Sequence, residues 1–176
     1  AFGMDAMSND TAAGSDWSIE AARQRYNIDR WGAGYFDINP EGHVVAWPLQ
    51  ERGAAVNLTD IIGEARGRDL RFPLLVRFQD ILRHRVQSIN EAFQQAIGEY
   101  SYRGKYRGVF PIKVNQLREV VEEILDAGTA YGYGLEVGSK PELLAGLALQ
   151  SQDGSLIICN GYKDAAFIRM ALMGRK

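Results

Sequence analysis

From residue 74 to residue 176, apolar runs that suit buried strands alternate with segments whose apolar residues recur every three or four positions. The predicted strands are Leu74–Phe78, Val109–Val114, Leu135–Val137 and Leu156–Asn160, and the helix predicted after each covers residues 81–100, 117–125, 143–149 and 167–172. Two parallel strands need a crossover connection, usually a helix, so the alternation predicts an α/β fold with a parallel sheet. We therefore expect about four strand–helix (βα) units.

The length of this region indicates which parallel sheet it forms. A complete (β/α)8 barrel takes about 250 residues, and the region holds about 100, which fits roughly half of one. We predict the N-terminal part of a (β/α)8 barrel, truncated after about four βα units. A four-stranded open sheet is the alternative. In both architectures a ligand binds at the carboxyl ends of the parallel strands.

The first 73 residues do not show this alternation of apolar runs and helical patterns. Residues 1–16 are small and polar without periodicity, and we predict a flexible leader there. Residues 17–73 are predicted to hold a short helix and a β-hairpin, with strands around Tyr35–Ile38 and His43–Trp47, followed by a connecting stretch. The hairpin is expected to belong to a β domain, and residues 74–176 form the truncated barrel domain.

Composition excludes several classes of protein. The chain has 20 Lys and Arg against 22 Asp and Glu, so it is not a basic nucleic-acid binder. Its single cysteine, Cys159, cannot form an internal disulfide, and a reducing cytoplasmic setting is expected. No run approaches the roughly 18 consecutive apolar residues of a membrane span, so we expect no membrane partner.

Polar residues at the ends of the predicted strands are the candidates for chemistry. Lys113 and Asn115 end the second strand, Glu136 lies near the end of the third, and Asn160 ends the fourth. By strand alternation Lys113 shares a face with Val109, which would place an amine on a covered strand. A desolvated lysine has a lowered pKa and is suited to form a Schiff base. The alternative is a side chain that extends from the strand end into solvent.

Three longer segments carry a family resemblance. They are Gly108-Val109-Phe110-Pro111-Ile112-Lys113-Val114-Asn115-Gln116, Gly134-Leu135-Glu136-Val137-Gly138-Ser139-Lys140-Pro141-Glu142-Leu143, and Ile158-Cys159-Asn160-Gly161-Tyr162-Lys163-Asp164. Together they resemble the biosynthetic arginine decarboxylases, which belong to the alanine-racemase-like class of pyridoxal-phosphate enzymes, beside the ornithine and diaminopimelate decarboxylases. The resemblance extends from about Trp17 to the end of the chain.

The resemblance implies that Lys113 is catalytic and binds pyridoxal 5'-phosphate as a Schiff base. Glu136 matches an acidic position that lies close to the lysine and the cofactor in ornithine decarboxylase, so it is a second cofactor-binding candidate. Its alternative role is an ion pair with Lys140 or Lys163. The resemblance adds Mg²⁺ as a further candidate cofactor, without a ligand for it in this sequence.

Two other residues in these segments have a simpler explanation. Ser139 and Glu142 have the spacing of a capping box that would open the helix over residues 143–149. Lys163 and Asp164 are also expected to be structural.

The implied reaction is the decarboxylation of L-arginine to agmatine and CO2 in polyamine biosynthesis. The resemblance implies a homo-oligomer, a dimer or a tetramer, that takes L-arginine as its small-molecule substrate. We expect these 176 residues alone to be inactive. Two alternatives stay open: a related decarboxylase for ornithine, lysine or diaminopimelate, and a non-catalytic regulatory homologue.

Overall fold

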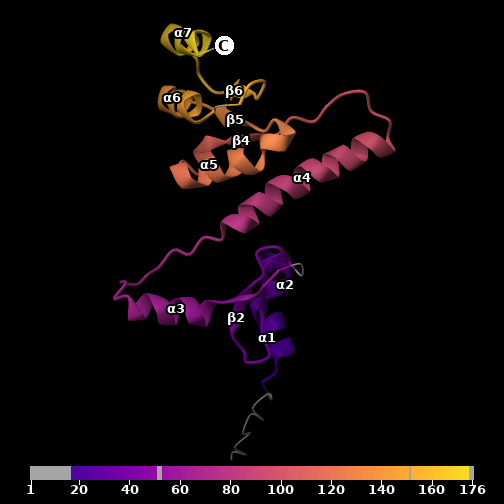
Figure 1. The fold of residues 1–176 in the computed structure, drawn as a ribbon, viewed down its shortest axis with the longest axis vertical. Helices are drawn as coiled ribbons and strands as arrows, with labels where there is room; N and C mark the ends of the chain where they lie inside the picture. Colours follow the sequence, from indigo (N-terminus) through magenta and orange to yellow (C-terminus); the bar gives the residue numbers. More distant parts are fainter. Residues whose placement is uncertain (1–16, 51–52, 151, 175–176) are drawn as a thin grey trace, which may run out of the picture. The chain divides into compact units, whose positions relative to one another are not determined.

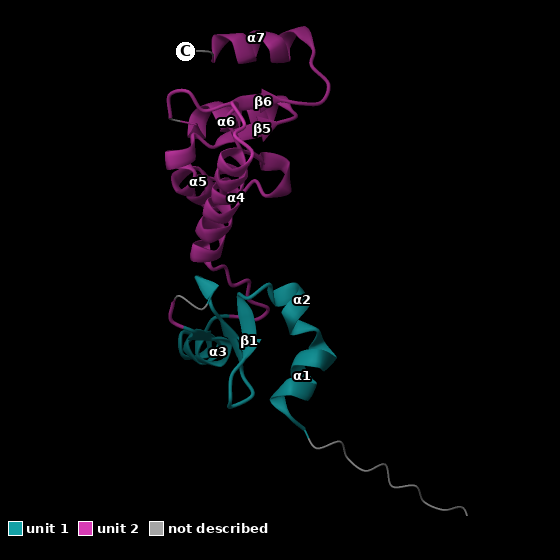
Figure 2. Cartoon of the chain, turned by 90° about the vertical axis from the view of Figure 1, so that its right-hand side faces the viewer, with its two compact units in different colours: residues 1–51, 55–70 teal, residues 52–54, 71–176 magenta. Residues whose placement is uncertain are grey.

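The computed structural model describes residues 17–50, 53–150 and 152–174, which fall into two compact units (Figure 2). Among these residues, the first unit holds 17–50 and 55–70, and the second holds 53–54, 71–150 and 152–174. Each unit has a three-stranded sheet of its own. The predicted leader, residues 1–16, lies outside the described residues.

The first unit contains the predicted hairpin. Strands β1 (Phe36–Ile38) and β2 (Val44–Ala46) pair antiparallel, with Phe36 opposite Ala46. The turn between them closes because the Asn39 side-chain oxygen accepts a hydrogen bond from the backbone N–H of His43 at 2.8 Å. Helices α1 (Ile19–Tyr26) and α2 (Ile28–Gly32) precede the hairpin, so the predicted short helix is present as two.

The stretch predicted as a connection after the hairpin contains regular structure. Strand β3 (Val56–Asn57) adds to β2, and helix α3 (Leu58–Gly67) follows directly. Asn57 caps this helix by accepting a hydrogen bond from the Thr59 N–H at 2.9 Å. Two glycines, Gly63 and Gly67, lower its intrinsic helix propensity, and for that reason the sequence pattern did not indicate a helix here.

The second unit has the alternation predicted from the sequence (Figure 1). Its elements are α4 (Gln79–Glu99), β4 (Val109–Pro111), the 3-10 turn η2 (Ile112–Val114), α5 (Arg118–Ala127), the 3-10 turn η3 (Thr129–Tyr131), β5 (Gly134–Val137), α6 (Lys140–Leu149), β6 (Ile157–Cys159) and α7 (Ala165–Met173). The strands pair parallel in the order β4-β5-β6. The prediction of an α/β fold with a parallel sheet is therefore confirmed.

One predicted strand does not form. Leu74–Phe78 precedes α4 without forming a strand, and Leu75 is 76% exposed. An apolar run becomes a strand only where a neighbouring strand accepts its backbone hydrogen bonds, and the parallel sheet of the described residues consists of β4, β5 and β6. Among the described residues the unit thus has three strands, each followed by a helix, and α4 before them.

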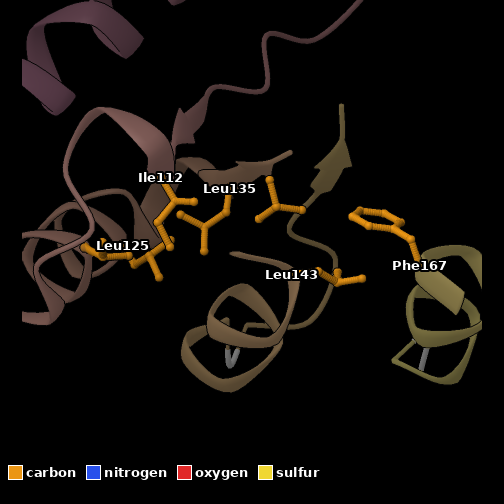
Figure 3. Packing of buried hydrophobic residues seen from close by; sticks show 7 residues of the cluster. Ile112, Leu125, Leu135, Leu143 and Phe167 are labelled. Carbon is orange, nitrogen blue, oxygen red and sulfur yellow. The ribbon is translucent and has the colours of Figure 1, made fainter. Parts of the chain in front are cut away.

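The core of this unit lies between the sheet and the helices that follow its strands (Figure 3). Leu135 and Val137 of β5 are fully buried and pack with side chains from the turn η2 and from the three following helices: Ile112, Val121, Leu125, Leu143 and Phe167. Successive side chains of a strand point to opposite faces. Glu136, between these two residues, therefore points to the face of the sheet opposite the helices.

Two adjacent leucines of α6 test this packing. Leu143 is 1% exposed and Leu144 is 58% exposed. We expect Leu143→Ala to lower the free energy of unfolding by about 2–5 kcal/mol, because it leaves a cavity in the core. The matched Leu144→Ala should change it by less than about 1 kcal/mol. Urea unfolding of both variants measures the difference, and equal losses would contradict this assignment of the helix faces.

Candidate functional site

Lys113 lies in the turn η2, directly after β4, and not within a strand as predicted. The parallel pairing ends at Pro111, opposite Glu136, and Pro111 has no N–H with which to continue the ladder. Strand alternation therefore does not set the direction of the lysine. Its side chain is exposed, and among the described residues it makes no hydrogen bond or ion pair.

Glu136 is buried in the middle strand of the sheet. It is 8% exposed and lies between Pro111 of β4 and Ile158 of β6 in the strand register. One of its carboxylate oxygens, Oε1, is buried and has no hydrogen-bond partner among the described residues. A buried carboxylate without a partner carries a large desolvation cost, and such groups concentrate at binding sites.

The two lysines weighed as partners for Glu136 have other contacts. Lys140 donates to Asp164 at 2.5 Å, and Lys163 donates to the backbone oxygen of Gly161 at 2.9 Å. No ion pair joins Glu136 to Lys113 in the described part of the chain either. The structure thus places Lys113 and Glu136 at the ends of neighbouring strands, with both charged groups unpaired.

The loop between β5 and α6 is held by the predicted helix cap. The Ser139 hydroxyl accepts a hydrogen bond from the Glu142 N–H at 3.3 Å, and the Glu142 carboxylate accepts one from the Gly138 N–H at 2.7 Å. The predicted Ser139 cap is confirmed, but the Glu142 carboxylate accepts from Gly138 and not from Ser139 as in a complete capping box. The carboxylate has one further contact, because its second oxygen accepts from the Gln116 side-chain amide at 3.2 Å. Gln116 was not among the predicted site residues, although it lies in a segment that carries the resemblance.

The loop between β6 and α7 is also stabilised by its own side chains. The Asn160 side-chain oxygen accepts from the Gly161 N–H at 2.7 Å, and Asp164 caps α7 by accepting from the Phe167 N–H at 2.8 Å. The hydrogen bond from Lys140, and then the one from Phe167, lower the pKa of Asp164. Asp164 thus joins the starts of α6 and α7, as its expected structural role requires.

A groove lies beside this set of loops. It is bordered by residues that follow β4, by the start of α6 and by the body of α6: Ile112, Gln116, Arg118, Ser139, Pro141, Glu142, Ala145, Ala148 and Leu149. Gln116 and Glu142, which are joined by a hydrogen bond, are both among these residues. Neither Lys113 nor Glu136 lines it, so the groove is separate from the two candidate residues.

Comparison with protein families identifies the class of this chain. Residues 86–176 match the model of the pyridoxal-dependent decarboxylases, described as their pyridoxal binding domain. The match covers more than half of the chain, and the chain belongs to this family.

Curated relatives give a narrower similarity. The chain is 48% identical over 160 residues to the biosynthetic arginine decarboxylase of Parasynechococcus marenigrum, and 53% identical over 163 residues to that of Alkalilimnicola ehrlichii. These matches cover 91% and 92% of this chain, and 25% and 26% of the two relatives. The chain therefore spans about a quarter of the length of the relatives it matches.

A solved structure shows the same fold. The crystal structure of the biosynthetic arginine decarboxylase SpeA from Campylobacter jejuni matches with a TM-score of 0.75 and 35% sequence identity. The match covers 85% of this chain and 24% of that one.

No helix in residues 17–50, 53–150 and 152–174 is both long and apolar enough to cross a membrane. In the same residues, no three His, Cys, Asp or Glu side chains gather as a metal ion would require.

The lowered pKa of Asp164 predicts a pH dependence of stability. A carboxyl group whose pKa is lower in the folded state than in the unfolded one stabilises the fold above the unfolded value, about 4, and this contribution is lost as the pH falls through the folded value. Asp164→Asn should therefore lower the unfolding midpoint in urea more at pH 7 than near pH 3. Asp153→Asn, at an exposed position before β6, is the matched control for a surface substitution and should change the midpoint little at pH 7.

Proposed function

We propose that the protein to which this chain belongs decarboxylates L-arginine to agmatine and CO2 with pyridoxal phosphate as cofactor. The observation that carries this proposal is the identity of 42–53% to proteins named biosynthetic arginine decarboxylase, over more than nine-tenths of the chain. Its membership of a family described as a pyridoxal binding domain supports the cofactor.

The geometry of the strand ends fits this cofactor. Pyridoxal phosphate offers an aldehyde to an amine, and the exposed Lys113 amine at the end of β4 is not engaged by any carboxylate among the described residues. When bound, the cofactor supplies an electron sink for the electrons released on loss of CO2. We assign covalent attachment to Lys113.

Glu136 fits beside a cationic group of such a ligand. Its buried carboxylate has an oxygen with no partner among the described residues, on the sheet face opposite the helices. A positive charge placed there would recover part of the desolvation cost. We assign Glu136 to hold the charge of the lysine amine or of the cofactor.

The wider architecture is part of the same proposal. We infer that residues 74–176 form the first part of a (β/α)8 barrel, that residues 17–73 belong to a β domain, and that the complete protein is a cytoplasmic homo-oligomer in polyamine biosynthesis. A requirement for Mg²⁺ stays a prediction, carried only by the resemblance.

A related decarboxylase acting on ornithine, lysine or diaminopimelate is the competing function, since the family model describes pyridoxal-dependent decarboxylases in general.

Labelling at Lys113 tests the proposal. The complete protein is incubated with pyridoxal phosphate and reduced with borohydride, and its peptides are mapped by mass. We expect a pyridoxyl group on the peptide with Lys113, and release of CO2 from arginine but not from the three competing amino acids. Lys113→Ala should abolish both while keeping the melting temperature of the cofactor-free protein, because no packing depends on the exposed amine.

The control is Lys105→Ala, at another exposed lysine near the start of β4, which should keep both the label and the activity. Full activity in Lys113→Ala would overturn the assignment. Release of CO2 from another amino acid would favour the competing function.

Glu136→Gln separates a binding role from a structural one. The substitution keeps the shape of the side chain and removes a charge that is costly to bury, so stability without cofactor should be unchanged or higher. Labelling at Lys113 at low cofactor concentration and decarboxylation should both fall by about tenfold or more. Thermal unfolding of the cofactor-free protein and the labelling assay measure the two effects. A loss of stability with unchanged labelling would make Glu136 structural.

A further inference from the structure

One carboxylate links the loops that follow β4 and β5. Glu142 Oε1 accepts from the side chain of Gln116, three residues after Lys113, and Glu142 Oε2 accepts from the backbone N–H of Gly138, two residues after Glu136. The two candidate residues for cofactor binding are therefore each followed by a segment that is bonded to Glu142.

The turn that carries Lys113 has few other anchors. Ile112, on one side of the lysine, is 2% exposed and belongs to the core. On the other side, Val114 is 71% exposed, and Asn115 accepts only from the N–H of Leu117, at 3.1 Å within its own loop. Among the described residues, the exposed hydrogen bond from Gln116 to Glu142 at 3.2 Å is thus the side-chain hydrogen bond that connects the C-terminal side of this turn to another element.

Capping of α6 does not account for this contact. The cap hydrogen bond that Ser139 accepts comes from the backbone of Glu142, which leaves the carboxylate free for other partners. In a capping box that carboxylate accepts from the N-cap residue itself. Here it accepts from Gly138, one residue earlier, and uses its second oxygen for Gln116.

We propose that Glu142 is a positioning residue that fixes the turn of Lys113 relative to the loop after β5. Its carboxylate holds Gln116 and Gly138 at once, so the end of β4 and the end of β5 move together. If the turn were anchored only on its N-terminal side, the Lys113 side chain would sample more orientations. Binding of the cofactor would then have to restrict these orientations, at a cost in affinity. The inference rests on the proposed function, because it takes Lys113 as the residue that binds the cofactor.

Labelling at subsaturating cofactor tests it in the complete protein. In Glu142→Ala, which removes both hydrogen bonds of the carboxylate, the fraction of chains labelled at Lys113 after borohydride reduction should fall roughly three- to tenfold. The matched control, Ser139→Ala, removes the cap and leaves the Glu142 carboxylate in place. It should lower the melting temperature of the cofactor-free protein but keep the labelled fraction.

A polar exchange tests the contact itself. Glu142→Gln can still accept from Gly138 and donate to the Gln116 oxygen, so labelling should be nearly unchanged. Gln116→Glu places two carboxylates together and should lower labelling about as much as Glu142→Ala. The double variant, Gln116→Glu with Glu142→Gln, restores a donor and an acceptor, and we expect recovery to within about twofold of the original protein.

The outcomes separate the two proposals. If the unsubstituted protein carries no label at Lys113, the proposed function fails and the positioning role falls with it. If it is labelled, and Glu142→Ala is labelled as well as Ser139→Ala, only the positioning role is overturned. Failure of the double variant to recover while it melts like the original protein would also overturn the contact between Gln116 and Glu142.

Discussion

The second unit depends on the two-sided burial of β5. This strand is paired on both edges, by β4 and by β6, and all four of its residues are buried. Leu135 and Val137 pack under the helices, and the same alternation turns Glu136 toward the opposite face. The packing that stabilises the unit therefore also sets the direction of the carboxylate. A shift of the strand register by one residue would bury the charge among the helices.

The fold was predictable where local pattern and tertiary environment agree. The helical spacing before Gly128 and the capping signal at Ser139 correspond to α5 and α6, because each buries its apolar face on the sheet. Leu74–Phe78 has the apolar composition of a strand, but pairing depends on a neighbour that a local pattern does not contain. At α3 the structure has a helix where a connecting stretch was predicted. Its two glycines lower the helix propensity of the sequence, and the Asn57 cap stabilises the helix.

The candidate site was predictable by residue type more than by geometry. Lys113 and Glu136 were candidates because they lie near strand ends, where ligands bind in parallel-sheet folds, and the family resemblance supplied their expected roles. The direction of the lysine could not be predicted, because Pro111 ends the strand earlier than the apolar run suggests. The contact between Gln116 and Glu142 spans 26 residues of sequence, and no spacing rule relates an amide after one strand to a carboxylate in the following helix.

The energetic cost of lacking a partner differs between Lys113 and Glu136. Lys113 is exposed, so water solvates its amine and an unpaired state carries little cost. Glu136 is buried, and its unpaired oxygen opposes folding. A fold keeps such a group against its own stability when binding later supplies the missing partner. The buried glutamate, more than the exposed lysine, is therefore the structural feature that supports the proposed role of this face in holding a charged ligand.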